Sequence, residues 1–268
     1  MAIAFEHDAA QKVSPPLLLR AGNMAPTLFI TPGLGGNIMG LSTFVNLIRT
    51  RQAIYGIQPR GQRVEDIAQH YLAAITRIQP RGPYVLVGFS FGGLPMLEVA
   101  RQLLERDEKI ALLAFLETYP HSRYWSLRSW IDVLARRAKH HALVLMQMPM
   151  RKAVPRIGEL LAGLLEHLRI RCGKFPRKLS STVDRQPGCE SLMVAWAEFR
   201  PSYYPGKITF LQGEIATSYP DALSAWGKLA KELEIHTVPG DHVGIVTSHA
   251  ERAANQFSRC LEKALLQA

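Results

Sequence analysis

A serine flanked by glycines is the first candidate for chemistry in this sequence. Residues 88–93 read Gly-Phe-Ser-Phe-Gly-Gly, follow the apolar run 84–87 and precede a stretch of helical periodicity. A tight turn from a strand into a helix holds such a serine at a strained apex, and the flanking glycines let neighbouring backbones approach closely. The pattern therefore predicts that Ser90 is an exposed nucleophile at the end of a strand.

A serine hydroxyl needs a base that takes its proton, and His242 is the best placed of the nine histidines. It lies in the turn 239–244, directly after an expected strand and before an expected helix. Other histidines have simpler interpretations, because His70 falls on an expected helix and His236 on an expected strand. We expect His242 to be the general base for Ser90.

A carboxylate must orient the imidazole, and Glu117 ends the apolar run 111–116. Burying an acid after so apolar a run is costly unless it is paired. Glu214 and Asp221, which follow the next expected strand, remain competing candidates. Asp241 is weaker, because adjacent residues seldom point at each other. We favour Glu117 as the third member of a Ser-His-acid triad.

Two backbone N–H groups are expected to stabilise the oxyanion that such a nucleophile creates. Phe91 follows the nucleophile and supplies the first. Gly33, in the loop Thr-Pro-Gly-Leu-Gly-Gly at 31–36, is the expected second donor. Phosphate binding by this loop is disfavoured, since it lacks both the Lys-Ser/Thr ending of a P-loop and the GxGxxG spacing.

The elements that must position these residues alternate between short apolar runs and helical stretches. Strands are expected at 16–19, 27–31, 53–58, 84–89 and 110–116, and helices at 40–50, 64–78 and 92–106. Strands that are apolar nearly throughout, separated by helices, indicate a parallel sheet covered on both faces. The fold class is therefore α/β.

The alternation breaks after residue 120. Strand signals are missing from 121 to about 185, where helical stretches rich in Arg, Leu and Met take over. The alternation then returns with strands at 207–212 and 233–238 and helices at 221–231 and 243–266. We interpret residues 1–268 as one domain that is interrupted by a helical insertion at 121–200.

Composition describes a folded, basic protein. Its 268 residues are 47% hydrophobic and 20% charged, which excludes a disordered tail. The three cysteines form no close pair, so neither a disulfide framework nor a zinc site is expected. The first ten residues carry Glu6 and Asp8 where a signal peptide would be basic and then apolar. We therefore expect a cytoplasmic protein without a membrane span, a metal or a cofactor.

The formal net charge of +10 is accounted for by residues 121–185, within the insertion. Residues 121–185 hold 14 Lys and Arg against four acids, and the remaining residues hold 18 basic and 18 acidic side chains. A basic surface at this place would attract an acidic partner over long range. Charge alone also allows a nucleic-acid binder, although no further motif supports one.

An ordered series of motifs resembles a known family. Its members are Tyr-Gly-Ile-Gln-Pro-Arg-Gly at 55–61, Gln-Pro-Arg-Gly-Pro-Tyr at 79–84, the serine motif at 88–93, Leu-Glu-Thr-Tyr-Pro at 116–120, Tyr-Pro-Gly at 204–206 and Gly-Asp-His at 240–242. The series resembles the thioesterase domains that end nonribosomal peptide and polyketide synthases. It covers roughly 15–120 and 203–265, and it leaves the insertion unmatched.

The resemblance implies an α/β-hydrolase fold with a helical lid and a Ser/acid/His triad. The substrates it implies are acyl, polyketide or peptidyl chains bound as thioesters to the phosphopantetheine arm of a carrier protein. The family's acid falls on Glu117, where Asp is usual, and Thr31 stands where a His often precedes Pro32. Carrier proteins of this kind are acidic, so the basic insertion is where one would dock.

Other functions remain open at this point. The same triad serves carboxylesterases and acyltransferases that act on esters without a carrier, and a non-catalytic or nucleic-acid-binding protein is a more remote alternative. Because no carrier motif precedes the matched region, the chain looks free-standing, and a domain excised from a synthase is the alternative that stays open.

Overall fold

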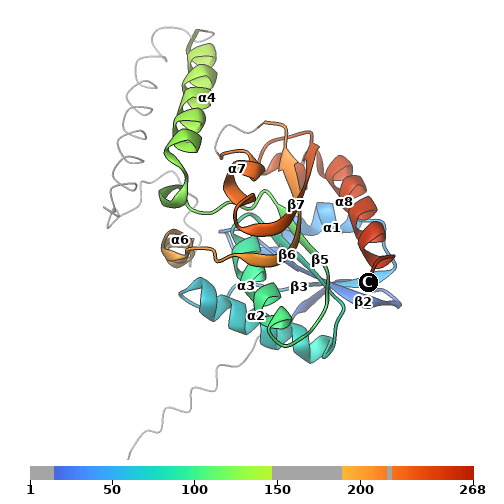
Figure 1. Cartoon of the computed structure of the whole chain (residues 1–268). Coiled ribbons are helices and arrows are strands. Elements are labelled where there is room, and N and C mark those ends of the chain that lie inside the picture. The colour runs from blue at the N-terminus through green and yellow to red at the C-terminus, as the bar shows by residue number, and fades with distance from the viewer. Residues whose placement is uncertain (1–14, 147–188, 216–218) are drawn as a thin grey trace, which may run out of the picture.

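The computed structural model describes residues 15–146, 189–215 and 219–268. At its centre lies a seven-stranded sheet in the order β1-β3-β2-β4-β5-β6-β7 (Figure 1). The strands are β1 (Leu17–Arg20), β2 (Met24–Thr31), β3 (Gln52–Gly56), β4 (Tyr84–Phe89), β5 (Ile110–Leu116), β6 (Tyr204–Gly213) and β7 (Ala230–Val238). Only the pair β1–β3 is antiparallel. The expected α/β fold with a mostly parallel sheet is confirmed.

Helices cover both faces of the sheet, as buried parallel strands require. One face carries α2 (Val64–Ile78) and α3 (Gly93–Leu104), and the other carries α1 (Ser42–Leu47) and α8 (Ala250–Leu265), as Figure 1 shows. Strand β2 serves both cores, because successive side chains point to opposite faces. Phe29 packs into the core under α2 and α3, while Leu28 and Ile30 pack into the core under α1 and α8.

The last helix, α8, is anchored by one apolar stripe. The stripe recurs at the spacing of a single helix face and includes Ala250, Ala253, Ala254, Phe257 and Leu261. The ring of Phe257 lies 5.8 Å from that of Phe44 in α1. This packing fixes the start of α8, and with it the loop that carries His242.

The segment between β5 and β6 contains helices in the residues that the structure describes. They are η3 (Ser122–Tyr124), α4 (Leu127–Met146) and α6 (Cys189–Glu198). In Figure 1, α4 projects beyond the carboxyl ends of the strands. Much of the predicted insertion, including Arg151 and Lys152, lies outside the described residues.

Three expected helices differ in extent from the observed ones. The stretch 40–50 is divided into η1 (Ile38–Leu41) and α1, and the stretch 243–266 into η4 (Gly244–Val246) and α8. The helix expected at 221–231 is wrong beyond its first turns, because α7 (Ala222–Trp226) ends at Gly227 and β7 begins at Ala230. Among the described residues, no helix has both the length and the apolar character that crossing a membrane requires.

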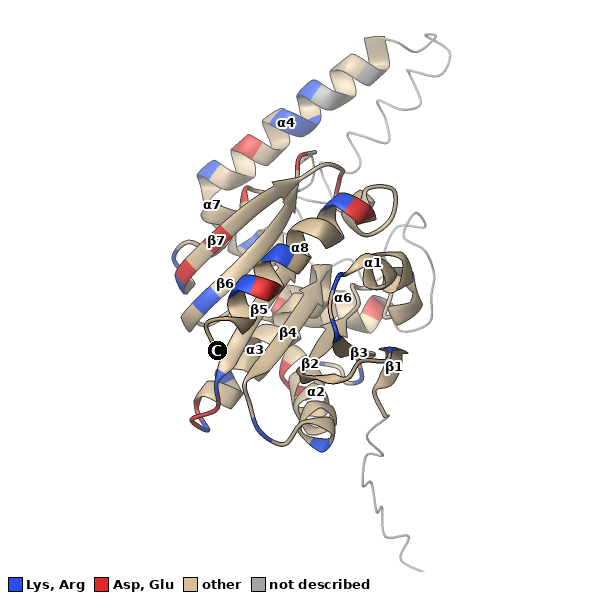
Figure 2. Ribbon diagram, turned by 90° about the vertical axis from the view of Figure 1, so that its right-hand side faces the viewer, with Lys and Arg blue, Asp and Glu red and all other residues tan. Residues whose placement is uncertain are grey.

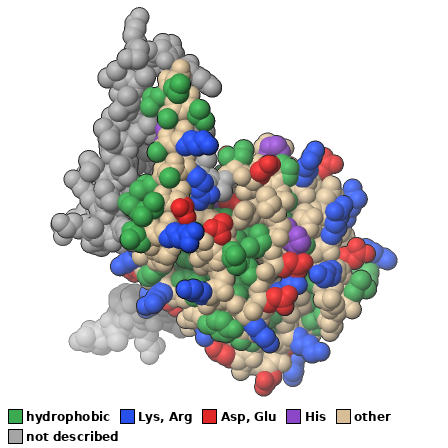
Figure 3. Space-filling model, turned by 45° about the horizontal axis from the view of Figure 1, so that its top comes forward, with side chains coloured by type: hydrophobic (Ala, Val, Ile, Leu, Met, Phe, Trp, Pro, Cys, Tyr) green, Lys and Arg blue, Asp and Glu red, His purple; other side chains and the backbone are tan. Residues whose placement is uncertain are grey.

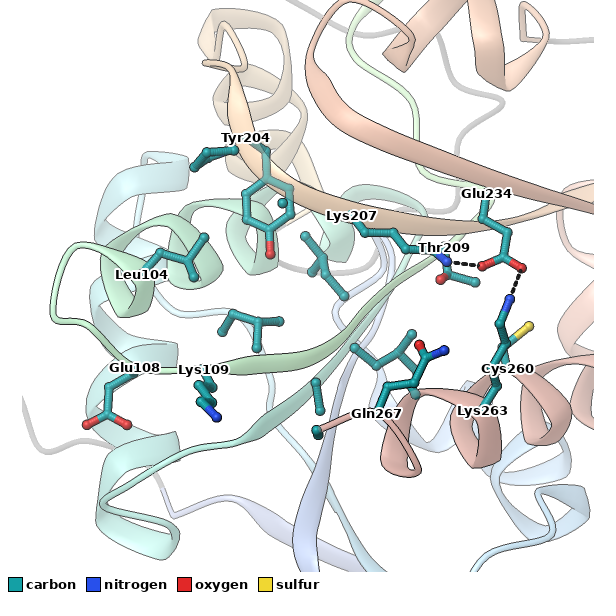
Figure 4. Close-up of a pocket in the computed structure, with 18 residues that line it drawn as sticks. Leu104, Glu108, Lys109, Tyr204, Lys207, Thr209, Glu234, Cys260, Lys263 and Gln267 are labelled. Atoms are coloured by element: carbon teal, nitrogen blue, oxygen red, sulfur yellow. Dashed lines mark hydrogen bonds and ion pairs between the residues drawn. The ribbon is translucent and has the colours of Figure 1, made fainter.

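A cavity of about 510 Å³ lies at the amino ends of β5 and β6 (Figure 4). Lys207 and Lys263 both contact the carboxylate of Glu234 there, at 2.5 and 3.3 Å. Since Ser90 follows the carboxyl end of β4, this cavity is at the opposite end of the sheet from the candidate nucleophile.

Candidate active site

Ser90 occupies a sharp turn between β4 and α3. Its φ is +52°, in the left-handed region that a residue with a side chain rarely adopts. A Cβ on Gly88 would lie 2.2 Å from the Cα of Gly93, and one on Gly92 would lie 2.3 Å from the carbonyl oxygen of Pro32. Only glycine fits at 88 and 92, which is the physical basis of the motif that the sequence analysis singled out.

His242 lies between Ser90 and the predicted acid. Its Nε2 is 2.9 Å from Ser90 Oγ, and its Nδ1 is 3.2 Å from Glu117 Oε2. With a proton on Nδ1, the ring donates to Glu117 and leaves Nε2 free to accept the hydroxyl proton of Ser90. The structure thus brings together three predicted residues that are separated by up to 152 positions.

Glu117 follows β5 and is 4% exposed. Its φ is +51°, which makes it a second non-glycine residue of the site in the left-handed region. Oε1 accepts a hydrogen bond of 2.6 Å from the N–H of Gly213 at the end of β6, and the hydroxyl of Tyr119 lies 3.5 Å from the same oxygen. These contacts leave Oε2 to face His242.

The competing acids have other contacts. The Asp221 carboxylate accepts hydrogen bonds from the N–H and the hydroxyl of Ser224 at the start of α7, and Asp241 accepts from the N–H of Gly244. Glu214 is exposed. Among the described contacts of His242, its carboxylate partner is Glu117.

Aromatic rings enclose the imidazole. Phe89 lies 5.4 Å from the His242 ring, and Tyr219 lies 4.8 Å from it. Tyr219 in turn stacks on Tyr119, with 4.6 Å between ring centres and 5° between their planes. Burial, with the charge of Glu117 as a second cause, raises the pKa of Tyr219 to about 12 and raises that of Tyr119 further. Both phenols therefore stay neutral at physiological pH.

The loop after β2 lies against the nucleophile. A Cβ on Gly33 would come within 3.1 Å of the Cβ of Ser90, so the two backbones are in close contact. The hydroxyl of Thr31 is 3.0 Å from the carbonyl oxygen of Gly92, which ties this loop to the serine turn. Gly33 and Phe91 both lie next to Ser90, and their function as oxyanion donors stays a prediction.

A small cavity of about 10 Å³ adjoins Ser90. It has room for about one water molecule. Its lining consists of Leu34, Ser90, Phe91, Glu117, Tyr119, Trp196 and Tyr219. The cavity is therefore too small to hold an acyl chain.

Gly213, Trp196 and Tyr219 belong to this site, and the sequence analysis assigned none of them. Gly213 is 96 positions from Glu117, and Tyr219 stands in a connection without periodicity. Tyr219 precedes Pro220 and the α7 cap Asp221, but a turn signal of this kind says nothing about which site the turn adjoins.

The sequence of this chain is similar to those of known proteins. The family model "Thioesterase domain" matches residues 26–261. A non-reducing polyketide synthase of Aspergillus ustus is 26% identical over 92% of this chain, and a dimodular nonribosomal peptide synthase of Bacillus subtilis is 33% identical over 45% of it. The matches span 13% and 6% of those two synthases, so the chain corresponds to a small part of each.

A solved structure has the same fold. It is the NocB thioesterase domain in covalent complex with a fluorophosphonate nocardicin G analog. The two structures superpose with a TM-score of 0.58 at 18% identity, over 89% of this chain and 95% of the other. At this level of identity the likeness concerns the fold.

Proposed function

The chain belongs to the thioesterase domain family, and from this premise we propose that it is a serine thioesterase with Ser90, His242 and Glu117 as its catalytic triad. Its substrates are acyl, polyketide or peptidyl chains bound to the phosphopantetheine arm of a carrier protein. The observation that carries the proposal is the position of His242, whose two ring nitrogens face Ser90 and Glu117.

The first half of the reaction acylates Ser90. Nε2 of His242 takes the hydroxyl proton while Oγ bonds to the thioester carbonyl carbon, and Glu117 stabilises the imidazolium through Nδ1. The tetrahedral intermediate collapses by breaking the carbon–sulfur bond. The departing sulfur takes the proton from Nε2, so that pantetheine thiol leaves and an acyl ester remains on Ser90.

The N–H groups of Gly33 and Phe91 are the proposed oxyanion donors. The close approach of Gly33 to the Ser90 side chain supports this assignment, as does the position of Phe91 immediately after the nucleophile. Losing one such donor typically costs about 3 kcal/mol of transition-state stabilisation.

The second half removes the acyl group. His242 accepts a proton from an attacking nucleophile, which bonds to the ester carbon while the Ser90 oxygen leaves and is reprotonated. Water gives a free acid, whereas a hydroxyl or amine of the chain itself gives a ring. The small cavity at Ser90 favours neither outcome, because it is too small to hold a folded acyl chain.

We also propose that the segment 121–200 is a lid and that an acidic carrier protein docks on it. The described helix α4 carries Arg128, Arg136, Arg137 and Lys139 against one acid, Asp132. Figure 2 shows segments of Lys and Arg along the ribbon of α4, and Figure 3 shows basic side chains on the surface of the projecting helix. A carrier that binds there would lie close to the carboxyl ends of the strands. Attraction between opposite charges would speed this encounter.

Intact-mass spectrometry tests the covalent intermediate. The protein is mixed with an acyl-pantetheine thioester, quenched in acid and weighed, with Ser90→Ala as the control. We expect a mass increase equal to the acyl group in the native protein and none in Ser90→Ala. A native protein that never acylates with any pantetheine thioester would contradict the proposal. Turnover of the matching oxygen ester distinguishes a thioesterase from a carboxylesterase.

Charge reversal tests docking. The double variant Arg128→Glu, Lys139→Glu changes two exposed side chains of α4. We expect a higher KM for a carrier-bound acyl group, and an unchanged KM for the same acyl group on free pantetheine. Equal KM values for the carrier-bound substrate in the native protein and the variant would exclude docking at these residues.

A further inference from the structure

The aromatic ring against His242 connects the triad to α4. We propose that Tyr219 is a positioning residue that fixes the His242 imidazole, and that Arg136 of α4 holds Tyr219 in place. The inference rests on the proposed function, because it assigns a task to His242. It goes further by naming a residue that contributes neither a proton nor a charge to the reaction.

The rings of Phe89 and Tyr219 limit how the imidazole can tilt. Phe89 precedes the nucleophile and lies 5.4 Å from the His242 ring, while Tyr219 lies 4.8 Å from it. The two rings are inclined to the imidazole by similar angles, 34° and 35°. With aromatic contacts from both residues, the ring keeps Nε2 on Ser90 and Nδ1 on Glu117.

Tyr219 is itself held on the face that stacks with Tyr119. Tyr119 is 2% exposed. Its carbonyl oxygen accepts a hydrogen bond of 3.0 Å from the indole N–H of Trp196. The stack of Tyr119 on Tyr219 is nearly parallel. A stack of this kind contributes about 1 kcal/mol beyond the area that it buries.

Arg136 supplies the connection to α4. Its Nη2 donates a hydrogen bond of 2.9 Å to the carbonyl oxygen of Tyr219, across 83 positions of sequence. Trp125, which lies just before α4, places its ring edge-on at 6.3 Å from Tyr219. Two residues at or near the start of the proposed lid therefore contact the residue that contacts His242.

The geometry also explains why a ring, rather than a hydroxyl, is needed at 219. The hydroxyl of Tyr119 lies within hydrogen-bond distance of Glu117, whereas the contacts of Tyr219 described above are made by its ring and its backbone carbonyl. Phenylalanine preserves those contacts, and leucine removes the stacking.

Three variants test the inference: Tyr219→Phe, Tyr219→Leu and Arg136→Ala. Tyr203→Leu, at an exposed tyrosine, is the matched control for Tyr219→Leu. Arg252→Ala, an exposed arginine of α8, is the control for Arg136→Ala. Two rates are measured for each protein. One is turnover of an acyl-pantetheine thioester, and the other is covalent labelling of Ser90 by a fluorophosphonate, which requires an activated serine but no thioesterase activity.

We expect Tyr219→Leu to lower kcat and the labelling rate by about 100-fold with little change in KM, since a misplacement near 1 Å costs a factor of this size. Tyr219→Phe keeps the stack and stays within about threefold of the native protein, and Arg136→Ala loses about tenfold in both rates. The two control variants match the native protein. Circular dichroism confirms that each variant is folded before its rates are compared.

Two results would overturn the inference. One is native labelling and turnover in Tyr219→Leu, and the other is an equal loss in Tyr219→Phe and Tyr219→Leu, which would assign the effect to the hydroxyl. If Tyr219→Leu does not fold, the rates of Tyr219→Phe and Arg136→Ala test the inference instead. Native rates in Arg136→Ala would contradict the proposed connection between Tyr219 and α4. A native protein that labels at Ser90 but turns over no thioester contradicts the proposed function alone, because the labelling rates still test Tyr219.

Discussion

The N–H of Gly213 donates a hydrogen bond of 2.6 Å to Oε1 of Glu117. This bond joins the carboxyl ends of β5 and β6, which are neighbouring parallel strands. It assigns one carboxylate oxygen to the scaffold and leaves the other to His242, so the orientation of the acid is set by the sheet. The backbone of Glu117, at a φ of +51°, is part of the same arrangement.

A shorter side chain at residue 117 cannot keep both the contact with Gly213 and the contact with His242. In Glu117→Asp the carboxylate is one methylene closer to the backbone, and it cannot keep both the Gly213 N–H and Nδ1 of His242 at their present distances. We expect kcat/KM for an acyl-pantetheine thioester to fall about 100-fold in Glu117→Asp, and about 10⁴-fold in Glu117→Ala, where the imidazole loses its charged partner. Native activity in Glu117→Asp would show that the bond to Gly213 is dispensable.

The rival acids are expected to be dispensable for catalysis. Glu214→Ala removes an exposed side chain and leaves kcat/KM within about twofold of native. Asp221→Ala removes the cap of α7 and lowers the free energy of unfolding by about 1 kcal/mol, while kcat stays near its native value. Urea denaturation and steady-state kinetics measure the two effects separately. A loss of kcat in either variant comparable to that of Glu117→Ala would transfer the acid role.

The serine turn tolerates no side chain at residue 88. In Gly88→Ala the new Cβ lies 2.2 Å from backbone atoms of Gly93, so the turn must open. We expect the melting temperature to fall by about 5 °C or more, with loss of Ser90 labelling. Gly40→Ala is the matched control, because nothing lies within 4 Å of its Cβ. If both variants melt alike, the turn is less tightly packed than its geometry indicates.

The ion pairs of Glu234 make a small, pH-dependent contribution to stability. Its hydrogen bond from Lys207 lowers the pKa of Glu234 below the ordinary 4.5, although burial opposes the shift, and the pKa of Lys207 is raised above 10.5. The stabilisation is therefore present between these two ordinary values. It is lost as the pH falls through the lowered pKa of Glu234 or rises through the raised pKa of Lys207.

Glu234→Gln tests this pH dependence. Because the lysines are partly exposed, we expect it to lower the free energy of unfolding at pH 7 by at most about 1 kcal/mol. The difference from the native protein should vanish once the pH falls below the lowered pKa of Glu234. Glu262→Gln, at an exposed glutamate of α8, serves as the control. A difference that does not change as the pH is lowered would mean that packing, rather than charge, is responsible.

The local pattern of apolar and polar residues was sufficient to predict the strands of the sheet and the helices that pack on it. The strand expected at 84–89 matches β4, and the helix expected at 64–78 matches α2. Both are long or strongly apolar segments in which side-chain period dominates. The prediction was poorest at the α7–β7 connection, because a single glycine ends α7 where helical periodicity alone would continue.

By itself, the sequence determined which residue types could perform nucleophilic chemistry and where they stand relative to strands. Ser90 and His242 follow from that order, because glycine at tight turns and polar residues after buried strands are local requirements. The choice among Glu117, Glu214 and Asp221 was beyond it, since all three follow strands. The tertiary structure favours Glu117, because β5–β6 pairing and the Gly213 N–H place it against His242, while the Asp221 carboxylate contacts Ser224. The contacts of Tyr219 with His242 and Arg136 likewise join residues that are far apart in the chain, and only packing in three dimensions specifies such pairs.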